Sequence, residues 1–403
     1  YKNIEIIVVN DGSNDNGKTD KILSSYGNKI KYYKKANGGV STALNMAINK
    51  SSGEYISWLS HDDLYYPDKI EKQIKYLIEN DYIGKNIILY SDYDLIDKKG
   101  RLITECKKDH QLLIKKPEYA LLRGNINGIT LLIPKKAFDD IGLFDEKLRC
   151  SQDYELWMRM ASKYKFTHMI GIIAKSRQHK EQVTHTSPRV AIEGNKLWTS
   201  MVRACNSKKM IELEGSVYNF YKEMAHFLKD TQYNETRLFC LNECKKLEKT
   251  TKNKTENVLV SIIIPFYNRI NLVVNSLKSA INQTHKNIEV LLINDGSFED
   301  ISPLKKVAKL DNRIKIIEIK ENKGAANARN VGIDNAKGDY VAFLDSDDSF
   351  VKDKVEKQLF NMLLNNANVS HTSYLRKGFN RETLINSGEL SGEAIPRIIY
   401  NCT

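Results

Sequence analysis

The chain has 403 residues, of which 41% are hydrophobic and 28% charged, an ordinary composition for a globular protein that is long enough to build two cores. Its net charge of +12 is compatible with nucleic acid, an anionic membrane surface or phosphorylated substrates, but the lysines are scattered and few aromatic or arginine residues cluster with them, so we expect no nucleic-acid partner. No apolar run is long enough to span a membrane, no signal peptide precedes the first predicted strand, and the six cysteines lack metal-binding spacing and are predicted to be free thiols in a reducing compartment.

In chain order, the first elements alternate between strands and helices. Short apolar runs that end in polar turns are typical of buried parallel strands, and apolar residues at helical spacing predict helices. The predicted elements are a strand over 4–9, a helix over 19–26, a strand over 55–59 and a helix whose apolar stripe is Ile70, Ile74, Leu77 and Ile78. Such alternation predicts an α/β sheet, in which ligands bind beyond the carboxyl ends of the strands.

The middle of the chain differs in composition. Residues 190–256 carry long helical patterns, and the Lys-, Thr-, Asn- and Glu-rich stretch 245–257 has little apolar content. We interpret this stretch as an interdomain linker.

The chain then repeats itself. The turn Asn10–Ser13 returns as Asn294–Ser297, and the acidic pair Asp62–Asp63 returns as Asp347–Asp348. A spacing of roughly 285 residues is too long for a solenoid unit and indicates two copies of one domain. Because polar and glycine positions are repeated together with the apolar ones, we expect the copies to share a site as well as a fold.

The two copies differ at their ends. The first has nothing to match residues 261–284, which include the apolar run Ile262–Ile264, and the second stops before any counterpart of 123–185. We therefore interpret the sequence as cut inside a domain at both ends. Ile262–Ile264 should form a central strand beside 288–293 and 342–344, whereas the first copy should expose an apolar sheet edge.

Acidic residues follow strands in both copies. Asp62–Asp63 and Asp345–Asp348 come directly after apolar runs, where carboxylates suit Mg²⁺ or Mn²⁺ bound to a diphosphate. A solvated turn that caps the next helix is the alternative, but the repetition favours a metal site. For Asp11 and Asp295, recognition of a ribose or base edge and simple turn chemistry are equally compatible with the motif.

A phosphate-loop pattern also occurs. Residues Gly12–Thr19 fit G-x4-G-K-[ST] between a predicted strand and a predicted helix. The second copy, Gly296–Pro303, has lost the second glycine and the lysine while its surroundings are retained. We interpret the match as coincidental, with a nucleotidase kept as an alternative.

Four ordered strings carry a resemblance to a known family: Val260–Asn268 (VSIIIPFYN), Ile293–Ser297 (INDGS), Asn322–Asn330 (NKGAANARN) and Phe343–Asp348 (FLDSDD). They resemble family 2 glycosyltransferases of the GT-A fold. The resemblance implies two Rossmann-like nucleotide-sugar-binding domains with mixed, mostly parallel sheets, joined by a helical segment. The implied ranges are 1–189 without its first strand, 190–256 as helices and linker, and 257–403 without its acceptor half.

The resemblance also implies roles for residues of this chain. The general base would be Asp153, within Gln152–Trp157. A divalent cation, Mn²⁺ or Mg²⁺, would be held by Asp62, Asp63 and His179 in the first copy and by Asp347 in the second. Donor-binding positions would be Asp11, Asp62, Pro265, Tyr267, Asn268, Asp295, Arg329 and Asp345.

Two departures from the family pattern lie in the first copy. Ser60 stands where the second copy has Asp345, and Leu44 stands where it has Arg329. The resemblance still favours an inverting transferase that moves a sugar from a nucleotide diphosphate, predicted as a UDP-sugar, to a glycan or lipid-linked acceptor in bacterial surface polysaccharide synthesis. We expect a cytoplasmic protein with possible peripheral contact with an anionic membrane surface. A non-catalytic nucleotide-sugar-binding or scaffold module is the alternative from another class.

Overall fold

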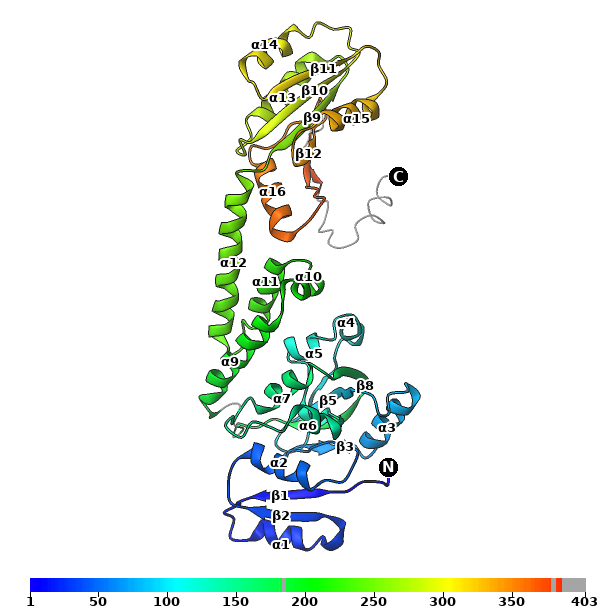
Figure 1. The fold of residues 1–403 in the computed structure, drawn as a ribbon, viewed down its shortest axis with the longest axis vertical. Coiled ribbons are helices and arrows are strands. Elements are labelled where there is room, and N and C mark those ends of the chain that lie inside the picture. The colour runs from blue at the N-terminus through cyan, green and yellow to red at the C-terminus, as the bar shows by residue number, and fades with distance from the viewer. Residues whose placement is uncertain (181, 183–185, 378–381, 386–403) are drawn as a thin grey trace. The chain divides into compact units, whose positions relative to one another are not determined.

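The protein was examined as a computed structural model that describes residues 1–180, 182, 186–377 and 382–385 (Figure 1). Its contacts divide the chain into two compact units. The first holds residues 1–206 and 224–239, and the second holds 207–223 and the described residues from 240 onward. Each repeat thus lies in a unit of its own, while the helical middle of the chain is shared between the two. The end of the predicted second domain, 386–403, lies outside the described residues.

The first unit is an α/β structure built from short strands and helices. Its elements are β1 (Ile7–Asp11), α1 (Lys18–Ser24), η1 (Gly27–Lys29), β2 (Lys31–Lys35), α2 (Val40–Lys50), β3 (Tyr55–Ile56), β4 (Leu64–Tyr65), α3 (Lys69–Glu79), β5 (Ile87–Ile96), β6 (Leu102–Cys106), α4 (His110–Lys115), α5 (Tyr119–Leu122), η2 (Gly128–Thr130), β7 (Ile133–Pro134), α6 (Lys136–Ile141), α7 (Gln152–Met160), β8 (Lys165–Arg177) and α9 (Arg189–Ala204).

The strands of the first unit form three separate sheets. A mixed sheet in the order β4-β8-β5-β6 has β5 parallel to β8, while β3 pairs with β7 and β1 pairs in parallel with β2. Within the described residues, β1 has no strand on its other edge. Ile4 and Ile6, just before β1, are 50% and 53% exposed, so apolar side chains are exposed next to this strand.

The second unit contains the complete parallel sheet. Its elements are α10 (Ser207–Glu214), β9 (Val260–Phe266), α13 (Ile270–Ile281), β10 (Ile288–Asp295), α14 (Ser302–Leu310), β11 (Ile314–Ile319), α15 (Ala325–Asn335), β12 (Tyr340–Phe343), α16 (Lys354–Asn365), β13 (Tyr374–Lys377) and β14 (Glu382–Ile385), while α11 (Val217–Phe227) and α12 (Asn234–Thr255) contain residues of both units.

The apolar run 262–264 is central, as predicted. Its strand β9 lies between β10 and β12 in the parallel order β11-β10-β9-β12. Every residue of β9 and β10 is buried, because helices cover both faces of a parallel sheet. Alternate residues point to opposite faces: Ile262 and Ile264 pack with α13, α14 and α16, whereas Ile263 packs with α15. The unit is therefore a three-layer α/β/α domain.

One sequence prediction was wrong in part. In the predicted apolar stripe of α3, Leu77 is buried and Ile74 packs against the core, but Ile78 is 64% exposed, and the polar Lys69 and Gln73 are buried. Gln73 Nε2 donates to the Thr130 carbonyl at 2.8 Å. This hydrogen bond draws the Gln73 side chain inward and so determines which face of α3 is buried. The stretch 245–257, interpreted as a linker, is helical as far as Thr255 in α12.

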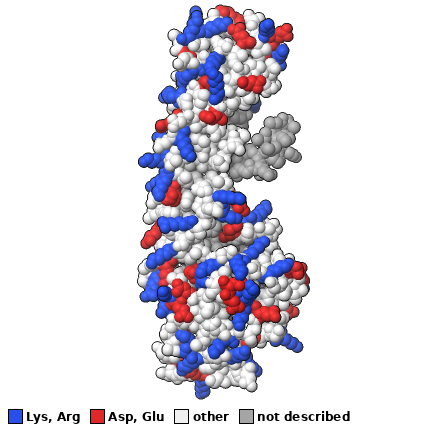
Figure 2. All heavy atoms as spheres, in the orientation of Figure 1, with Lys and Arg blue, Asp and Glu red and all other residues white. Residues whose placement is uncertain are grey.

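None of the described helices is long and apolar enough to cross a bilayer. Within the described chain, no disulfide joins Cys106, Cys150, Cys205, Cys240 and Cys244. Lysine and arginine are interspersed with acidic residues over the face that Figure 2 shows, and they form no single basic strip there.

Candidate nucleotide-sugar site

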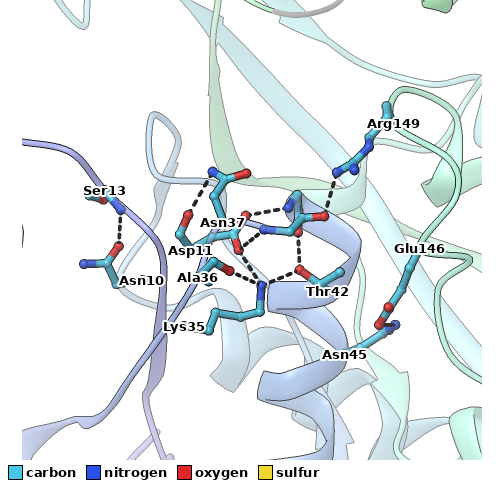
Figure 3. Close-up of polar contacts among 12 residues, drawn as sticks. Asn10, Asp11, Ser13, Lys35, Ala36, Asn37, Thr42, Asn45, Glu146 and Arg149 are labelled. Carbon is cyan, nitrogen blue, oxygen red and sulfur yellow. Dashed lines mark hydrogen bonds and ion pairs between the residues drawn. The ribbon is translucent and has the colours of Figure 1, made fainter.

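The carboxylate of Asp11 lies at the end of β1 in a cradle of hydrogen-bond donors. It accepts from the backbone amides of Gly38 at 2.9 Å and Gly39 at 2.7 Å, and Lys35 Nζ lies 2.7 Å away (Figure 3). Burial would raise the pKa of Asp11, but the hydrogen bond from Lys35 and the two amides hold it below its ordinary value. The carboxylate is therefore charged and fixed where a ligand of this fold binds.

The second repeat builds the same cradle around Asp295. The backbone amides of Lys323 and Gly324 donate to this carboxylate at 3.0 and 2.8 Å. Asp295 is only 3% exposed. Because the arrangement recurs without a lysine ion pair, the amides of the facing loop are the shared part of the cradle.

A glycine follows the aspartate in both repeats for a steric reason. Gly12 and Gly296 have φ angles of 75° and 73°. A Cβ at Gly12 would lie 2.6 Å from the backbone nitrogen of Asn37, and one at Gly296 would lie 2.7 Å from that of Asn322. Only glycine permits this close approach of the turn to the cradle loop.

The acidic loop of the first repeat is fastened to the end of β8. His179 Nε2 lies 3.2 Å from Asp62 Oδ2. The Arg177 backbone amide donates to Asp63 Oδ1 at 2.7 Å. The side-chain Nε of Arg177 donates to the carbonyl of Asp62 at 2.7 Å. Burial raises the pKa of Asp63. Of the predicted metal ligands, the structure thus brings Asp62 and His179 together and gives Asp63 a backbone partner.

The pair of Asp62 and His179 fits a divalent cation. A carboxylate beside an imidazole is a suitable donor set for Mn²⁺, and His179 Nδ1 is buried with no partner. No group of three or more His, Cys, Asp or Glu side chains within the described chain could hold a metal ion. Further ligands would have to come from phosphate and water, as is usual for Mg²⁺ in nucleotide sites.

The predicted base, Asp153, lies in the first turn of α7. Its side chain is partly buried, and the hydrogen bonds among the described residues include none to it. Burial raises the pKa of Asp153 to about 6. The N-cap of α7 is Ser151, so Asp153 does not cap the helix, and its carboxylate is free to take a proton near neutral pH.

Aromatic packing connects α7 to the acidic loop. Trp157 of α7 is 1% exposed and stacks on Trp58, with ring centroids 6.3 Å apart. Trp58 lies between β3 and the acidic loop. Helix α7, which carries Asp153, and the segment that leads to Asp62 therefore share one core.

The acidic loop of the second repeat is open and paired with arginines. Arg329 Nη2 lies 2.6 Å from Asp345 Oδ1, and Arg269 Nη1 lies 3.7 Å from Asp347 Oδ2. Burial, together with the charges of Asp347 and Asp345, raises the pKa of Asp348. These predicted donor and metal residues lie together, but their carboxylates are occupied by arginines.

The ion pair explains the departures seen in the first repeat. Leu44 and Ser60 correspond to Arg329 and Asp345, which contact each other. Loss of both partners leaves no unpaired charge. The two departures are therefore one paired change, and they are compatible with an intact first site.

The segment after β9 is partly structural. Pro265 is buried in β9, and Asn268 Oδ1 accepts hydrogen bonds from the backbone amides of Phe298 and Glu299 at 3.0 and 3.3 Å. Tyr267 is 43% exposed and packs edge-on against Phe298, which is 82% exposed. Asn268 thus holds the turn that follows Asp295, while the two aromatic rings remain accessible.

Within the phosphate-loop pattern, the carboxylate of Asp15 binds Thr19. Asp15 Oδ2 accepts from the Thr19 backbone amide at 2.8 Å and from its hydroxyl at 2.5 Å. A phosphate loop would present these two groups to phosphate and Mg²⁺. Their use by a carboxylate argues against a nucleotidase site at 12–19.

Sequence reasoning missed Lys35, Arg149 and Glu193, which support the site. Arg149 donates to the carbonyl of Gly38, and Glu193 accepts from the segment before α7. No motif marks them, because their partners lie far away in sequence. Asn45 of α2 also supports the site, because it bonds to the backbone of Phe144.

Comparisons with known proteins identify the family of this chain. The sequence profile of Glycosyl transferase family 2 matches residues 1–133 and 261–394. An uncharacterized glycosyltransferase of Rickettsia bellii is 47% identical over all of this chain, which spans 58% of that relative's length. The Escherichia coli UDP-Glc:alpha-D-GlcNAc-diphosphoundecaprenol beta-1,3-glucosyltransferase WfgD is 36% identical over 36% of this chain and 55% of its own.

Among solved structures, S. aureus TarS 1-349 in complex with UDP aligns at 17% identity and a TM-score of 0.42, over 62% of this chain and 71% of its own. The two segments that match the family are the two repeats, and together they make up more than half of the sequence. The chain therefore belongs to glycosyltransferase family 2, with one copy of the family's α/β fold in each unit.

Proposed function

We propose that the first repeat transfers a sugar from a nucleotide diphosphate, predicted as a UDP-sugar, to a hydroxyl of a glycan or lipid-linked acceptor. The observation that carries this proposal is the assembly, within one unit, of the Asp11 cradle, the Asp62–His179 pair and the unpaired carboxylate of Asp153. Synthesis of a bacterial surface polysaccharide is the proposed setting, since WfgD acts on a lipid diphosphate. The proposed location is the cytoplasm, with peripheral contact at the membrane face.

The chemistry assigns one task to each group. Asp153 takes the proton of the acceptor hydroxyl as that oxygen forms a bond to the anomeric carbon and the bond from this carbon to the diphosphate oxygen breaks. Direct displacement inverts the anomeric centre, and a single carboxylate suffices on the acceptor side. Asp62 and His179 would hold a divalent cation, which supplies a positive charge for the leaving diphosphate. Asp11, held by the amides of Gly38 and Gly39, would bind the nucleoside.

The second repeat retains the cradle of Asp295 and the accessible Tyr267 and Phe298 rings. We propose that this part of the chain also binds a nucleotide-sugar, whereas the transfer assigned to Asp153 takes place in the first repeat.

Calorimetry tests donor binding. UDP should bind with Mn²⁺ present and much more weakly in EDTA, and ATP with Mg²⁺ should bind weakly under both conditions. Asp62→Asn should weaken the Mn²⁺-dependent component. Asp68→Asn is the matched control, because the Asp68 side chain is 48% exposed and pairs with Lys72 at the start of α3. Equal UDP affinity in EDTA would count against the proposed cation.

Turnover tests the reaction itself. UDP release from UDP-glucose or UDP-GlcNAc should require an acceptor, for which a GlcNAc-diphospholipid of the kind named for WfgD is the first choice. Tight UDP binding without turnover, in a protein of the relatives' full length, would favour the non-catalytic binding module.

A further inference from the structure

We propose that Glu193 and Arg149 are positioning residues that fix the helix of the base Asp153 relative to the nucleotide loop Asn37–Gly39. This inference rests on the proposed function of the first repeat. The two side chains form a continuous link: Glu193 of α9 holds the backbone before α7, and the side chain of Arg149 extends from that backbone to the nucleotide loop. We call this link the strap. All of its residues belong to the first unit.

The carboxylate of Glu193 binds several backbone amides just before α7. It accepts hydrogen bonds from the amides of Arg149 at 3.1 Å, Cys150 at 2.9 Å and Ser151 at 3.2 Å, and from the Ser151 hydroxyl at 3.3 Å. Ser151 is the N-cap of α7 but makes no cap bond with its own side chain. A carboxylate from another helix thus takes the place of a local cap and fixes the start of α7.

The guanidinium of Arg149 reaches the nucleotide loop. Its Nη1 donates to the carbonyl of Gly38 at 2.6 Å. Figure 3 shows the Arg149 side chain extending from its own loop toward the loop that surrounds Asp11. The amide of Gly38 binds the Asp11 carboxylate while its carbonyl binds Arg149. One residue therefore connects the two sides of the site.

A Cβ at Gly39 would meet Arg149. It would lie 1.9 Å from Arg149 Nη1, the end of a flexible side chain, and the φ of Gly39 is 94°. At the corresponding Gly324 of the second repeat, φ is 88° and a Cβ would meet no described atom within 4 Å. The positive φ is therefore what both repeats share and what favours glycine, and in the first repeat this loop also lies against Arg149.

A second contact holds the same segment. Asn45 Nδ2 donates to the carbonyl of Phe144 and to Glu146 Oε1, each at 3.0 Å, and the amide of Phe144 donates to Asn45 Oδ1 at 3.0 Å. The segment 144–151 is therefore anchored to α2 at its start and to α9 at its end. Glu193 and Arg149 act on the end that leads directly into Asp153.

The expected consequence is a loss in turnover with little change in donor affinity. A shift of about 1 Å between reacting groups can cost on the order of a hundredfold in rate. Glu193→Ala should therefore lower kcat by roughly a hundredfold and leave the KM of UDP-glucose or UDP-GlcNAc roughly unchanged. Glu193→Gln retains one acceptor oxygen and should recover part of the loss. Lys196→Ala is the matched control, an exposed residue of the same helix α9.

Arg149→Ala breaks the other end of the strap. It should lower kcat to a similar extent, and the double variant with Glu193→Ala should be no worse than the more damaging single variant, because either change interrupts the same link. Multiplicative losses in the double variant would overturn the strap, since they would show two independent effects.

Hydrogen exchange measured by mass spectrometry gives a readout that does not need activity. Glu193→Ala should accelerate exchange in the peptide 149–156, and Lys196→Ala should not. UDP with Mn²⁺ should slow exchange in 149–156 in the parent chain but not in Arg149→Ala. Unchanged exchange in Glu193→Ala together with unchanged kcat would overturn the proposal. Faster exchange in a chain that turns over no UDP-sugar would reject the proposed transfer and with it the positioning role.

Discussion

Strands β1 and β10 have nearly the same sequence pattern and the same motif at their ends, but their surroundings differ. Strand β10 lies between β9 and β11, and all of its residues are buried. Among the described strands, β1 pairs with β2 alone, and of its residues only Asn10 is buried. Comparing the two strands therefore distinguishes the features that vary with the neighbouring strands from those that stay the same.

The polar geometry is the same in both surroundings. Asn10 and Asn294 each accept a hydrogen bond from the serine amide three residues later, at 2.9 and 3.0 Å. The charge pair between Glu5 and Lys31, 2.6 Å apart, corresponds to that between Glu289 and Lys315, 2.7 Å apart. The turns and the Glu–Lys charge pairs therefore have the same geometry in both repeats, although the burial of the apolar residues around them differs.

The sharpest expected difference between the repeats lies in catalysis. Asp153→Asn should lower kcat by about 10²- to 10⁴-fold with nearly unchanged UDP affinity, since it removes only a proton acceptor. In the second repeat, Asp347→Asn should leave turnover far less affected. Steady-state kinetics with calorimetry of UDP decides this. Comparable losses of kcat in both variants would show that the second repeat takes part in transfer.

The pH dependence should carry the same signature. Burial raises the pKa of Asp153 to about 6, and a base works only when ionised, so kcat should rise as the pH rises through about 6. The folded state therefore holds the proton of Asp153 more tightly than the unfolded state does. Ionisation of this carboxyl lowers the stability of the fold as the pH rises from its ordinary pKa of 3.8 toward 6. Asp153→Asn should therefore be more stable than the parent at neutral pH. A rate profile that is flat between pH 5 and 7 would contradict the assignment of the base.

Core truncations should differ strongly between the two strands. Leu292→Ala in β10 should cost about 2–5 kcal/mol, because Leu292 is fully buried. Val8, at the matching position of β1, is only half-buried, so Val8→Ala should cost about 1 kcal/mol or less.

Two optical signals can separate these effects. All three tryptophans, 58, 157 and 198, lie in the first unit, so denaturation followed by tryptophan fluorescence reports on that unit, while circular dichroism reports on both. Leu292→Ala should shift the dichroism transition and leave the fluorescence transition in place. Equal and small shifts for Leu292→Ala and Val8→Ala would show that β1 and β10 are packed alike.

The glycine of the turn should be equally necessary in both repeats. Gly12→Ala and Gly296→Ala combine a positive φ with a backbone contact below 3 Å, and each should cost about 1–3 kcal/mol in its own unit. Gly17→Ala is the control, because its φ is 77° but a Cβ would meet nothing within 4 Å. Denaturation measured by the same two signals tests this. A loss at Gly17 as large as that at Gly12 would assign the cost to φ alone.

The smallest effect should come from the paired change. Arg329→Leu with Asp345→Ser converts the second repeat to the pattern of the first, and it should alter stability by less than about 1 kcal/mol, because the ion pair is exposed. UDP affinity of the double variant shows whether the pair serves the donor instead. A large loss of affinity would mean that Leu44 and Ser60 have weakened the first site.

The sequence by itself determined the duplication, the order of strands and helices around each motif, and the central place of Ile262–Ile264. These features follow from short-range patterns: apolar runs, glycine at positive φ and aspartate at strand ends, each of which has a local physical cause. The resemblance carried by those motifs also placed Asp62 with His179, although the two are far apart in the chain.

Only the tertiary structure decided which polar residues are buried and what holds the start of helix α7, which carries Asp153. Lys69 and Gln73 are buried in α3 because the carbonyls of Leu131 and Thr130 offer them partners, and a hydropathy pattern contains no information about such distant partners. Glu193 and Arg149 are separated from the groups they bind by stretches of up to 111 residues. Their spacing carries no periodicity, so their role becomes visible only when the chain is folded and their hydrogen bonds are formed.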